Sequence, residues 1–252
     1  MIKTVICFAF VVAAVFVLIP LGIVVVVFSL LGLRKPMSIL MYRIAQGWAL
    51  FMIKLIGCKV TVKGRENIPR KEGVCFVSNH GSIFDILLLL AYTGRPFGFI
   101  AKKELLLIPF LNLWISVLGG LFIDRKNARK AVRTISKGVA RIRAGGAMII
   151  FPEGHRSRGQ GLLPFHPGSF KLATHAEAVI VPVALAGTYD VFEKNYRVKR
   201  VPVEITFCKA IKTSAIPPTG QKQILSDQIY GVIKEALDNE NREAAGPQVC
   251  AK

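Results

Sequence analysis

Hydrophobic and polar positions follow two different patterns along this chain. Residues 5–33 include no charged side chain. A continuous helix of that length would extend about 43 Å, more than the ~30 Å hydrocarbon core of a bilayer. Pro20 and Gly22 lie near its middle, where they should kink or break the helix. The run predicts either one tilted, kinked membrane span or a shallow helical hairpin, and it is too long for a cleaved signal peptide.

A second helix is predicted over residues 37–57, with Pro36 at its start. At about 100° per residue, its polar positions gather on one face, and the rest of its surface is aliphatic or aromatic. These polar positions are Arg43, Gln46, Gly47 and Lys54. The pattern favours a helix that lies in the membrane interface. The alternative is a helix that packs on the folded domain and keeps one face wet.

After Gly57 the pattern becomes that of a folded domain, with short apolar runs between stretches of helical periodicity. Strands are expected at 59–62, 74–78, 97–101, 120–124, 147–151, 179–184 and 201–208, and helices at 83–92, 127–143, 168–177 and 226–238. This alternation predicts an α/β fold, with a layered and largely parallel sheet flanked by helices. We therefore divide the chain into membrane-anchoring N-terminal helices (1–57), an α/β domain (58–238) and a flexible polar tail (239–252).

Charge and composition narrow the range of partners. The chain carries 34 Lys and Arg against 15 Asp and Glu, a formal net charge of +19, and is 52% hydrophobic. This favours an anionic membrane surface or anionic ligands. Nucleic acid fits less well, because the basic residues are spread out and no nucleic-acid-binding motif is present. Basic residues flank the apolar run; they are Lys3, Arg34, Lys35 and Arg43. If the run spans the membrane, this bias predicts that the remaining chain lies on the cytoplasmic side.

The five cysteines indicate neither a zinc site nor a disulfide framework, because they are widely spaced and form no CxxC pair. We expect them to be small hydrophobic residues of a reducing compartment. Cys75, in a predicted strand, should be buried, and no G-x-S-x-G elbow is present. The sequence therefore indicates no nucleophile for covalent catalysis.

Polar side chains gather where predicted strands end, which is where ligands bind in parallel sheets. The first group is in SNHGSIFD (78–85), between two apolar runs. Ser82 and Asp85 fit the S-x-x-D capping pattern, in which His80 would be an ordinary turn residue. On one continuous helix, His80 and Asp85 would point about 140° apart. If His80 precedes the helix, it can instead hydrogen-bond Asp85 and act as a general base towards a hydroxyl group.

The second group indicates a phosphate site. The segment FPEGHRSRG (151–159) leaves a strand through Pro and Gly, and it presents arginine and serine side chains that suit a phosphate. Arg125 follows one neighbouring strand, and Lys102 and Lys103 follow another. Solvated surface cations are the alternative interpretation.

These motifs, taken together, resemble the glycerolipid acyltransferases. NHGSIFD resembles their N-H-x-x-x-x-D motif, AKKELLLIPF their K-x-E-L…P segment, and GGLFIDR their second motif. FPEGHRS resembles F-P-E-G-T-R-S, LPFHPGSFKLA is similar to the stretch that follows it, and VPVAL resembles the fourth motif. The series is in family order over residues 59–208. It is most similar to the 1-acylglycerol-3-phosphate acyltransferases, which make phosphatidic acid.

The resemblance implies roles for individual residues. His80 would be the general base and Asp85 would orient it. The acceptor, lysophosphatidic acid, would be bound by Glu153, Gly154, Arg156 and Ser157, with Arg125 and Lys103 as further phosphate contacts. The acyl donor would be acyl-CoA or acyl carrier protein, no metal or other cofactor would be needed, and the enzyme would work at the cytoplasmic membrane.

Two departures from the family pattern bear on the acceptor. His155 stands where the motif usually has threonine, and His166 and Pro167 stand where a lysine is often found. An acyltransferase for another lysophospholipid or a lyso-aminolipid is therefore an alternative. A non-enzymatic protein that binds anionic lipids is a third possibility, although it would not need the His80–Asp85 pair.

Overall fold

The computed structural model describes residues 1–30, 34–108 and 111–245. Its strands are β1 (Lys59–Lys63), β2 (Val74–Ser78), β3 (Phe97–Lys102), β4 (Leu121–Ile123), β5 (Ala147–Ile150), β6 (Val179–Ala186), β7 (Pro202–Phe207) and β8 (Ile211–Lys212). Its helices are α1 (Ile2–Leu30), α2 (Arg34–Ile56), α3 (Phe84–Tyr92), α4 (Leu111–Val117), α5 (Ala128–Arg143), α6 (Lys171–Ala176), α7 (Thr188–Val191) and α8 (Gln221–Ala245).

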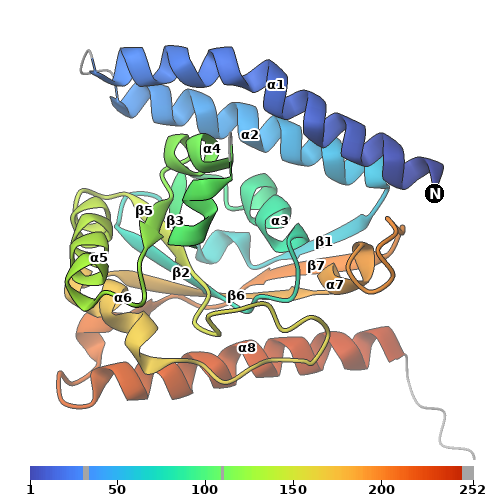
Figure 1. Cartoon of the computed structure of the whole chain (residues 1–252). Coiled ribbons are helices and arrows are strands. Elements are labelled where there is room, and N and C mark those ends of the chain that lie inside the picture. Colours follow the sequence, from blue (N-terminus) through green and yellow to red (C-terminus); the bar gives the residue numbers. More distant parts are fainter. Residues whose placement is uncertain (31–33, 109–110, 246–252) are drawn as a thin grey trace, which may run out of the picture.

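The strands form one sheet between two layers of helices (Figure 1). The strand order is β1-β7-β6-β2-β5-β3-β4, and β8 pairs with β6. All neighbouring pairs are parallel except β6 with β7 and β6 with β8. The predicted fold class is confirmed. Because β2 to β6 run parallel, the turns that leave their carboxyl ends share one edge of the sheet.

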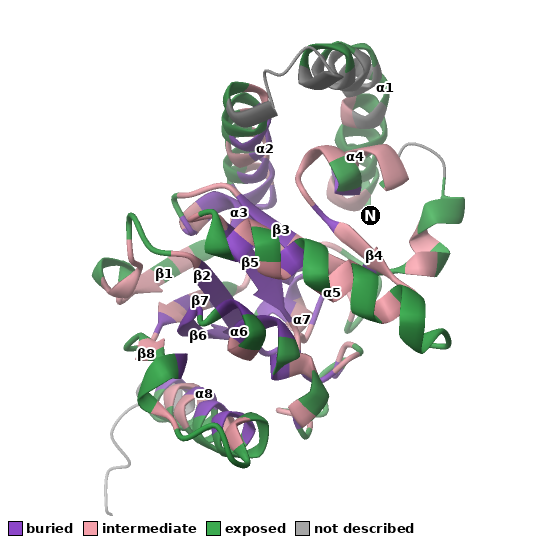
Figure 2. Ribbon diagram, turned by 90° about the vertical axis from the view of Figure 1, so that its left-hand side faces the viewer, coloured by how far each residue is buried: buried purple, intermediate pink, exposed green. Residues whose placement is uncertain are grey.

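Two hydrophobic cores lie on opposite faces of this sheet, and β2 contributes to both. Val74 and Phe76 point into the core beneath α2 and α3, and Cys75 and Val77 point into the core covered by α5, α6 and α8. All four side chains are fully buried. This explains why β2 is a continuous apolar run, as strands covered on both faces are. Figure 2 shows the buried residues concentrated in these central strands.

The N-terminal segment is a pair of helices side by side and antiparallel (Figure 1). The structure departs from the prediction here, because α1 continues through Pro20 without an interruption. The hairpin was predicted within residues 5–33, but the observed helical hairpin consists of α1 and α2. Residues 31–33, the end of the predicted apolar run, lie outside the described residues. Within the described chain, one helix, Pro36–Ile56, is long and apolar enough to cross a membrane by length and composition, with a mean hydropathy of 1.4.

Helix α2 packs on the domain, as the alternative interpretation of its pattern required. Tyr42, Ala49 and Met52 are buried in the core above the sheet. Gln46, on the predicted polar face, is half-buried: its amide donates to the Ala91 carbonyl of α3 at 2.9 Å, and its carbonyl accepts from Arg43 on the same face at 3.3 Å. A polar side chain on the buried side of a helix is satisfied when a neighbouring helix offers a carbonyl.

The C-terminal prediction was also partly wrong. The closing helix was expected at 226–238, with a loose tail from residue 239, but α8 is helical from Gln221 to Ala245. Glu240 in its last part is buried and accepts a hydrogen bond from Thr206 of β7. Packing against the sheet therefore stabilises the last part of α8, where the hydrophobic periodicity of the sequence is weak. The remaining predicted tail, residues 246–252, lies outside the described part of the chain.

Candidate active site

The site begins at the carboxyl end of β2, where the chain turns before α3. Asn79 is buried, and its amide bridges to β6: Nδ2 donates to the Leu185 carbonyl and Oδ1 accepts from the Leu185 N–H, each at 2.9 Å. The Asn79 side chain thus extends the β2–β6 pairing beyond the last backbone pair, Ser78 with Val183. It therefore fixes the backbone from which the next residue, His80, projects.

His80 and Asp85 form the contact that the sequence allowed. His80 lies before the helix, and its Nδ1 is 2.8 Å from Asp85 Oδ2. The Asp85 side chain is fully buried, whereas 18% of the His80 side chain is exposed. A buried carboxylate on Nδ1 fixes the tautomer in which Nδ1 carries the proton and Nε2 is an acceptor. The arrangement can therefore draw a proton from a hydroxyl group that approaches Nε2.

The same aspartate caps the helix. Asp85 Oδ2 accepts from the Ser82 N–H at 2.9 Å, and Ser82 Oγ accepts from the Phe84 N–H at 3.1 Å. The first bond is one half of a capping box. The other half is not formed, because the Ser82 hydroxyl accepts from Phe84 instead of Asp85, whose N–H donates to the Ser82 carbonyl at 3.4 Å. Capping and the histidine contact thus coexist on one oxygen, as the sequence permitted. Asp85 Oδ1 is buried and has no hydrogen-bond partner among the described residues.

The turn after β5 supports His80 from two directions. The ring of Phe151 stacks on the imidazole, with centroids 4.1 Å apart and planes inclined by 20°. The buried Glu153 accepts from the His80 backbone N–H at 2.7 Å and from the Leu163 N–H at 3.3 Å. Burial raises the pKa of Glu153 to about 7; the two backbone hydrogen bonds act against this and the nearby Asp85 charge adds to it. Glu153 thus holds the backbone of His80.

The rest of this turn carries the other predicted residues of the motif, and Ser157 links the turn to His80. Gly154 has a φ of +76°, a conformation that suits glycine, and the buried Ser157 donates its backbone N–H to the His80 carbonyl at 2.8 Å. Arg156 forms an ion pair with Glu193, whose side chain is 12% exposed. His155, the departure from the family motif, is exposed.

The two outlying cations differ in their surroundings. Arg125 donates to the Gly154 carbonyl at 3.0 Å, so it lies against the same turn as Arg156. Lys103 is instead paired with Asp124 at 2.8 Å. That contact lowers the pKa of Asp124 and raises that of Lys103, first through the hydrogen bond between them. Arg125 therefore contacts the 151–159 turn directly, whereas Lys103 contacts Asp124, the residue that follows β4.

Three residues of the site were missed from the sequence. Asn79 and Phe151 adjoin predicted site residues, but their contacts are with positions far along the chain. Glu193 had a weak signal, as the one acid among the basic residues of 192–200. The expectation for Cys75 is confirmed: it is fully buried, and burial raises the pKa of its thiol to about 12.

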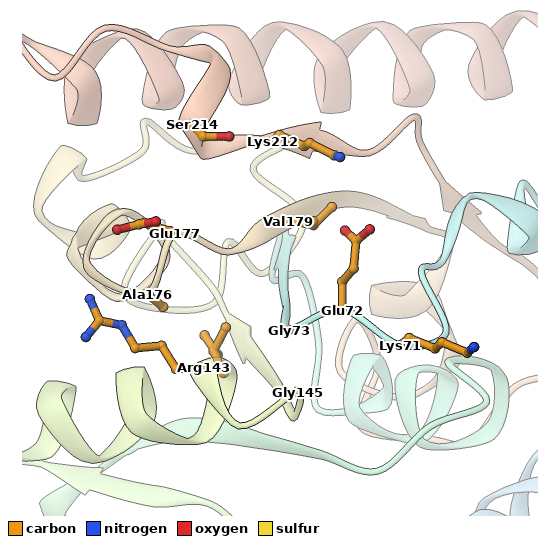
Figure 3. Close-up of a pocket in the computed structure, with 11 residues that line it drawn as sticks. Lys71, Glu72, Gly73, Arg143, Gly145, Ala176, Glu177, Val179, Lys212 and Ser214 are labelled. Atoms are coloured by element: carbon orange, nitrogen blue, oxygen red, sulfur yellow. The ribbon is translucent and has the colours of Figure 1, made fainter.

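A cavity of about 540 Å³ lies at the opposite edge of the sheet. It is lined by residues next to the amino ends of β2, β5 and β6, including Gly73, Gly145 and Val179 (Figure 3). Charges of both signs surround it, from Lys71, Glu72 and other side chains. None of the predicted site residues lines this cavity, so it is separate from the His80 site.

Comparison with known proteins assigns the family. The acyltransferase family model matches residues 59–186. A 1-acyl-sn-glycerol-3-phosphate acyltransferase of Borreliella burgdorferi is 39% identical over 141 residues, which are 56% of this chain and 56% of that protein. A 1-acyl-sn-glycerol-3-phosphate acyltransferase of Haemophilus influenzae is 31% identical over 67% of this chain and 70% of that protein. A probable 1-acyl-sn-glycerol-3-phosphate acyltransferase of Mycoplasma genitalium is 32% identical over 79% of this chain and 76% of that protein.

The fold has a solved counterpart as well. The crystal structure of the 1-acyl-sn-glycerophosphate (LPA) acyltransferase from Thermotoga maritima aligns over 95% of both chains, with a TM-score of 0.78 and 24% sequence identity. The alignment covers α1 and α2 as well as the sheet, because so little of either chain is left out. At this identity the likeness concerns the fold, and the matched family model carries the assignment: this chain belongs to the acyltransferase family.

Proposed function

We propose that this chain transfers a fatty acyl group from an acyl thioester to the sn-2 hydroxyl of 1-acylglycerol-3-phosphate, which gives phosphatidic acid. The names of its relatives support the reaction. The observation that carries it is the 2.8 Å contact between His80 Nδ1 and the buried Asp85, which leaves Nε2 as a base on a partly open side chain.

The proposed step is a direct transfer. Nε2 of His80 takes the proton of the sn-2 hydroxyl as its oxygen attacks the thioester carbonyl carbon. Asp85 stabilises the imidazolium that forms. The carbon–sulfur bond then breaks, and the leaving thiolate takes the proton from Nε2, so that the histidine is regenerated. Acyl-CoA and acyl carrier protein both supply such a thioester, and each is compatible with this step.

The acceptor phosphate would bind at the 151–159 turn. Arg156 belongs to this turn and Arg125 lies against it. Guanidinium groups bind phosphate through paired N–H donors. Lys103 is a more distant contact, because it is paired with Asp124. A glycerol 3-phosphate group could thereby present its neighbouring hydroxyl to His80.

We also propose that the enzyme works at a membrane, with its catalytic domain on the cytoplasmic side. Large apolar side chains of α1 are exposed, among them Ile2 (79%) and Val5 (65%). Residues of this kind on an apolar helix favour contact with lipid. Both proposed substrates carry acyl chains, so a membrane-bound site would meet them at a raised local concentration.

The proposal is tested with the purified protein in detergent or vesicles. Lysophosphatidate and a long-chain acyl thioester are supplied, and phosphatidic acid is measured. His80→Ala should lower kcat by about 10³-fold or more. His175→Ala, an exposed histidine of α6, is the matched control and should keep wild-type turnover. Wild-type turnover by a folded His80→Ala protein would show that the base is misassigned.

A second test concerns the acceptor, because the exposed His155 replaces the usual threonine of the motif. Lysolipids with and without a phosphate monoester are compared in one panel. We expect a preference for the monoester, since two arginines serve the site. Equal use of diester or amine-bearing acceptors would favour the alternative, an acyltransferase for another lysophospholipid or a lyso-aminolipid.

A further inference from the structure

Glu193 uses each of its carboxylate oxygens on a different part of the candidate active site. Oε1 pairs with Arg156 Nη1. Oε2 accepts from the backbone N–H of Ile83, the residue before α3, at 3.3 Å. Ile83 lies between His80 and Asp85 in the chain. One side chain from the 192–200 segment therefore joins the turn that carries the proposed base to the arginine of the proposed phosphate site.

The segment that carries Glu193 is itself anchored. The ring of Phe192 packs against Phe8 of α1, with centroids 5.7 Å apart, and against Tyr196 at 6.3 Å. The Val198 N–H donates to Thr4 Oγ1 at 3.0 Å, and the Lys199 N–H donates to the Val191 carbonyl at 2.8 Å. The carboxylate thus has a fixed support, and only 12% of its side chain is exposed.

We infer that Glu193 is a positioning residue, which sets the place of Arg156 relative to His80 for binding of the acceptor phosphate. This inference rests on the proposed function. The phosphate and the sn-2 hydroxyl of the acceptor are separated by a short, fixed chain of atoms, so the cation and the base must be held at a matching separation. An arginine side chain alone has many rotamers, and a charge-assisted hydrogen bond to a fixed carboxylate reduces them.

Only one guanidinium nitrogen of Arg156, Nη1, contacts Glu193 among the described residues. The remaining N–H groups are available for a ligand, since guanidinium carries five donors in a planar fork. The carboxylate can therefore orient the arginine without occupying the whole fork.

The test uses Glu193→Gln, which removes the charge but keeps an oxygen that can accept from the Ile83 N–H. The matched control is Asp190→Asn, an equal change three residues earlier, at an ion pair with Lys194 that is exposed on both sides. We expect Glu193→Gln to raise the KM for lysophosphatidate about tenfold, as the loss of a charge-assisted hydrogen bond does. The kcat and the KM for the acyl thioester should stay within about threefold of wild type, as should every parameter of Asp190→Asn.

Two further measurements separate this inference from the proposed reaction. In an Arg156→Ala background, Glu193→Gln should have no additional effect on KM, because it acts through Arg156. In the resting enzyme without substrate, Glu193→Ala should accelerate hydrogen exchange of the peptides that cover residues 80–86 and 153–158, and Asp190→Ala should not. This arm tests the positioning role even if wild-type enzyme does not acylate lysophosphatidate.

The inference is overturned by any of three results. One is hydrogen exchange that is the same in Glu193→Ala and Asp190→Ala. Another is a KM effect that persists without Arg156. The third is a KM that falls in Glu193→Gln, which would make the carboxylate a competitor of the phosphate instead of a support for the arginine.

Discussion

His80 is held by three different kinds of contact: a buried carboxylate on Nδ1, an aromatic ring against its face, and a carboxylate on its backbone N–H. A histidine with this many supports has little freedom to turn, and a base that is already oriented lowers the entropic part of the barrier. The residue that contributes most is Asp85, because its one oxygen serves both the imidazole and the start of α3.

Asp85→Asn should therefore lower kcat by about 10²- to 10⁴-fold, with a smaller effect on KM. The neutral amide cannot stabilise the imidazolium, and its second polar atom would lie at the buried Oδ1 position, which lacks a hydrogen-bond partner in the described chain. Steady-state kinetics on protein with an unchanged circular dichroism spectrum measure this. A variant that retains wild-type kcat would rule out a role for the carboxylate in catalysis.

Glu153 gives a pH dependence to stability. Burial raises its pKa in the folded protein to about 7, above the ~4.3 of an unfolded chain. Its contribution is then fully present at low pH and is lost as pH rises from about 4.3 through about 7, by at most about 4 kcal/mol. Thermal melts between pH 5 and 8 should show Glu153→Gln losing less stability than wild type with rising pH. Parallel curves for the two proteins would contradict this.

At the residue scale, the sequence predicted the residues that act through nearby positions. His80 and Asp85 are five positions apart, and the capping pattern lies within four, so local geometry decided both. Glu193 and Asn79 could not be predicted in the same way. Their partners, Arg156 and Leu185, are distant in the chain, and only the packed sheet brings them together.

At the scale of elements, the Asn79 amide extends the pairing of β2 with β6 beyond the last residues of their ladder, Ser78 and Val183. Asn79→Ala would leave the N–H and the carbonyl of Leu185 unpaired in a buried place, and should cost about 2–4 kcal/mol of the free energy of unfolding. Asn67→Ala is the control. It removes a single bond, to the Phe207 carbonyl, and should cost about 1 kcal/mol. Denaturant melts compare the two, and equal losses would mean that the Asn79 bridge adds nothing.

Strands and helices with strong periodicity were predicted well, and those decided by tertiary contacts were not. The run at β2 and the amphipathic α5 lie where the pattern placed them. The seven-residue α4 was missed, since it is too short for a periodic signal. Pro20 does not break α1, although an isolated helix would be weakened there. The extent of α8 was underestimated because contacts such as Glu240 with β7 are absent from the local pattern.

The whole molecule combines a net charge of +19 with an apolar helix, so two forces should act on membrane binding. We expect stronger sedimentation with vesicles that contain anionic lipid than with neutral phosphatidylcholine vesicles. Raising NaCl from 0.1 to about 0.5 M should remove that difference, because the Debye length falls. Binding to neutral vesicles should persist, since it depends on the exposed side chains of α1. Binding that ignores both lipid charge and salt would contradict an electrostatic contribution.

The contacts of Phe8 with Phe192 and of Thr4 with Val198 have a consequence for where the enzyme is competent. The helix expected to meet lipid is also a structural part of the segment that supports Arg156. A shortened, water-soluble version that begins after α2 would lose that support and should bind its acceptor poorly, even if its sheet folds. Acyl transfer would then require α1 to be in place, and a proteolytic fragment that lacks α1 should use its acceptor poorly.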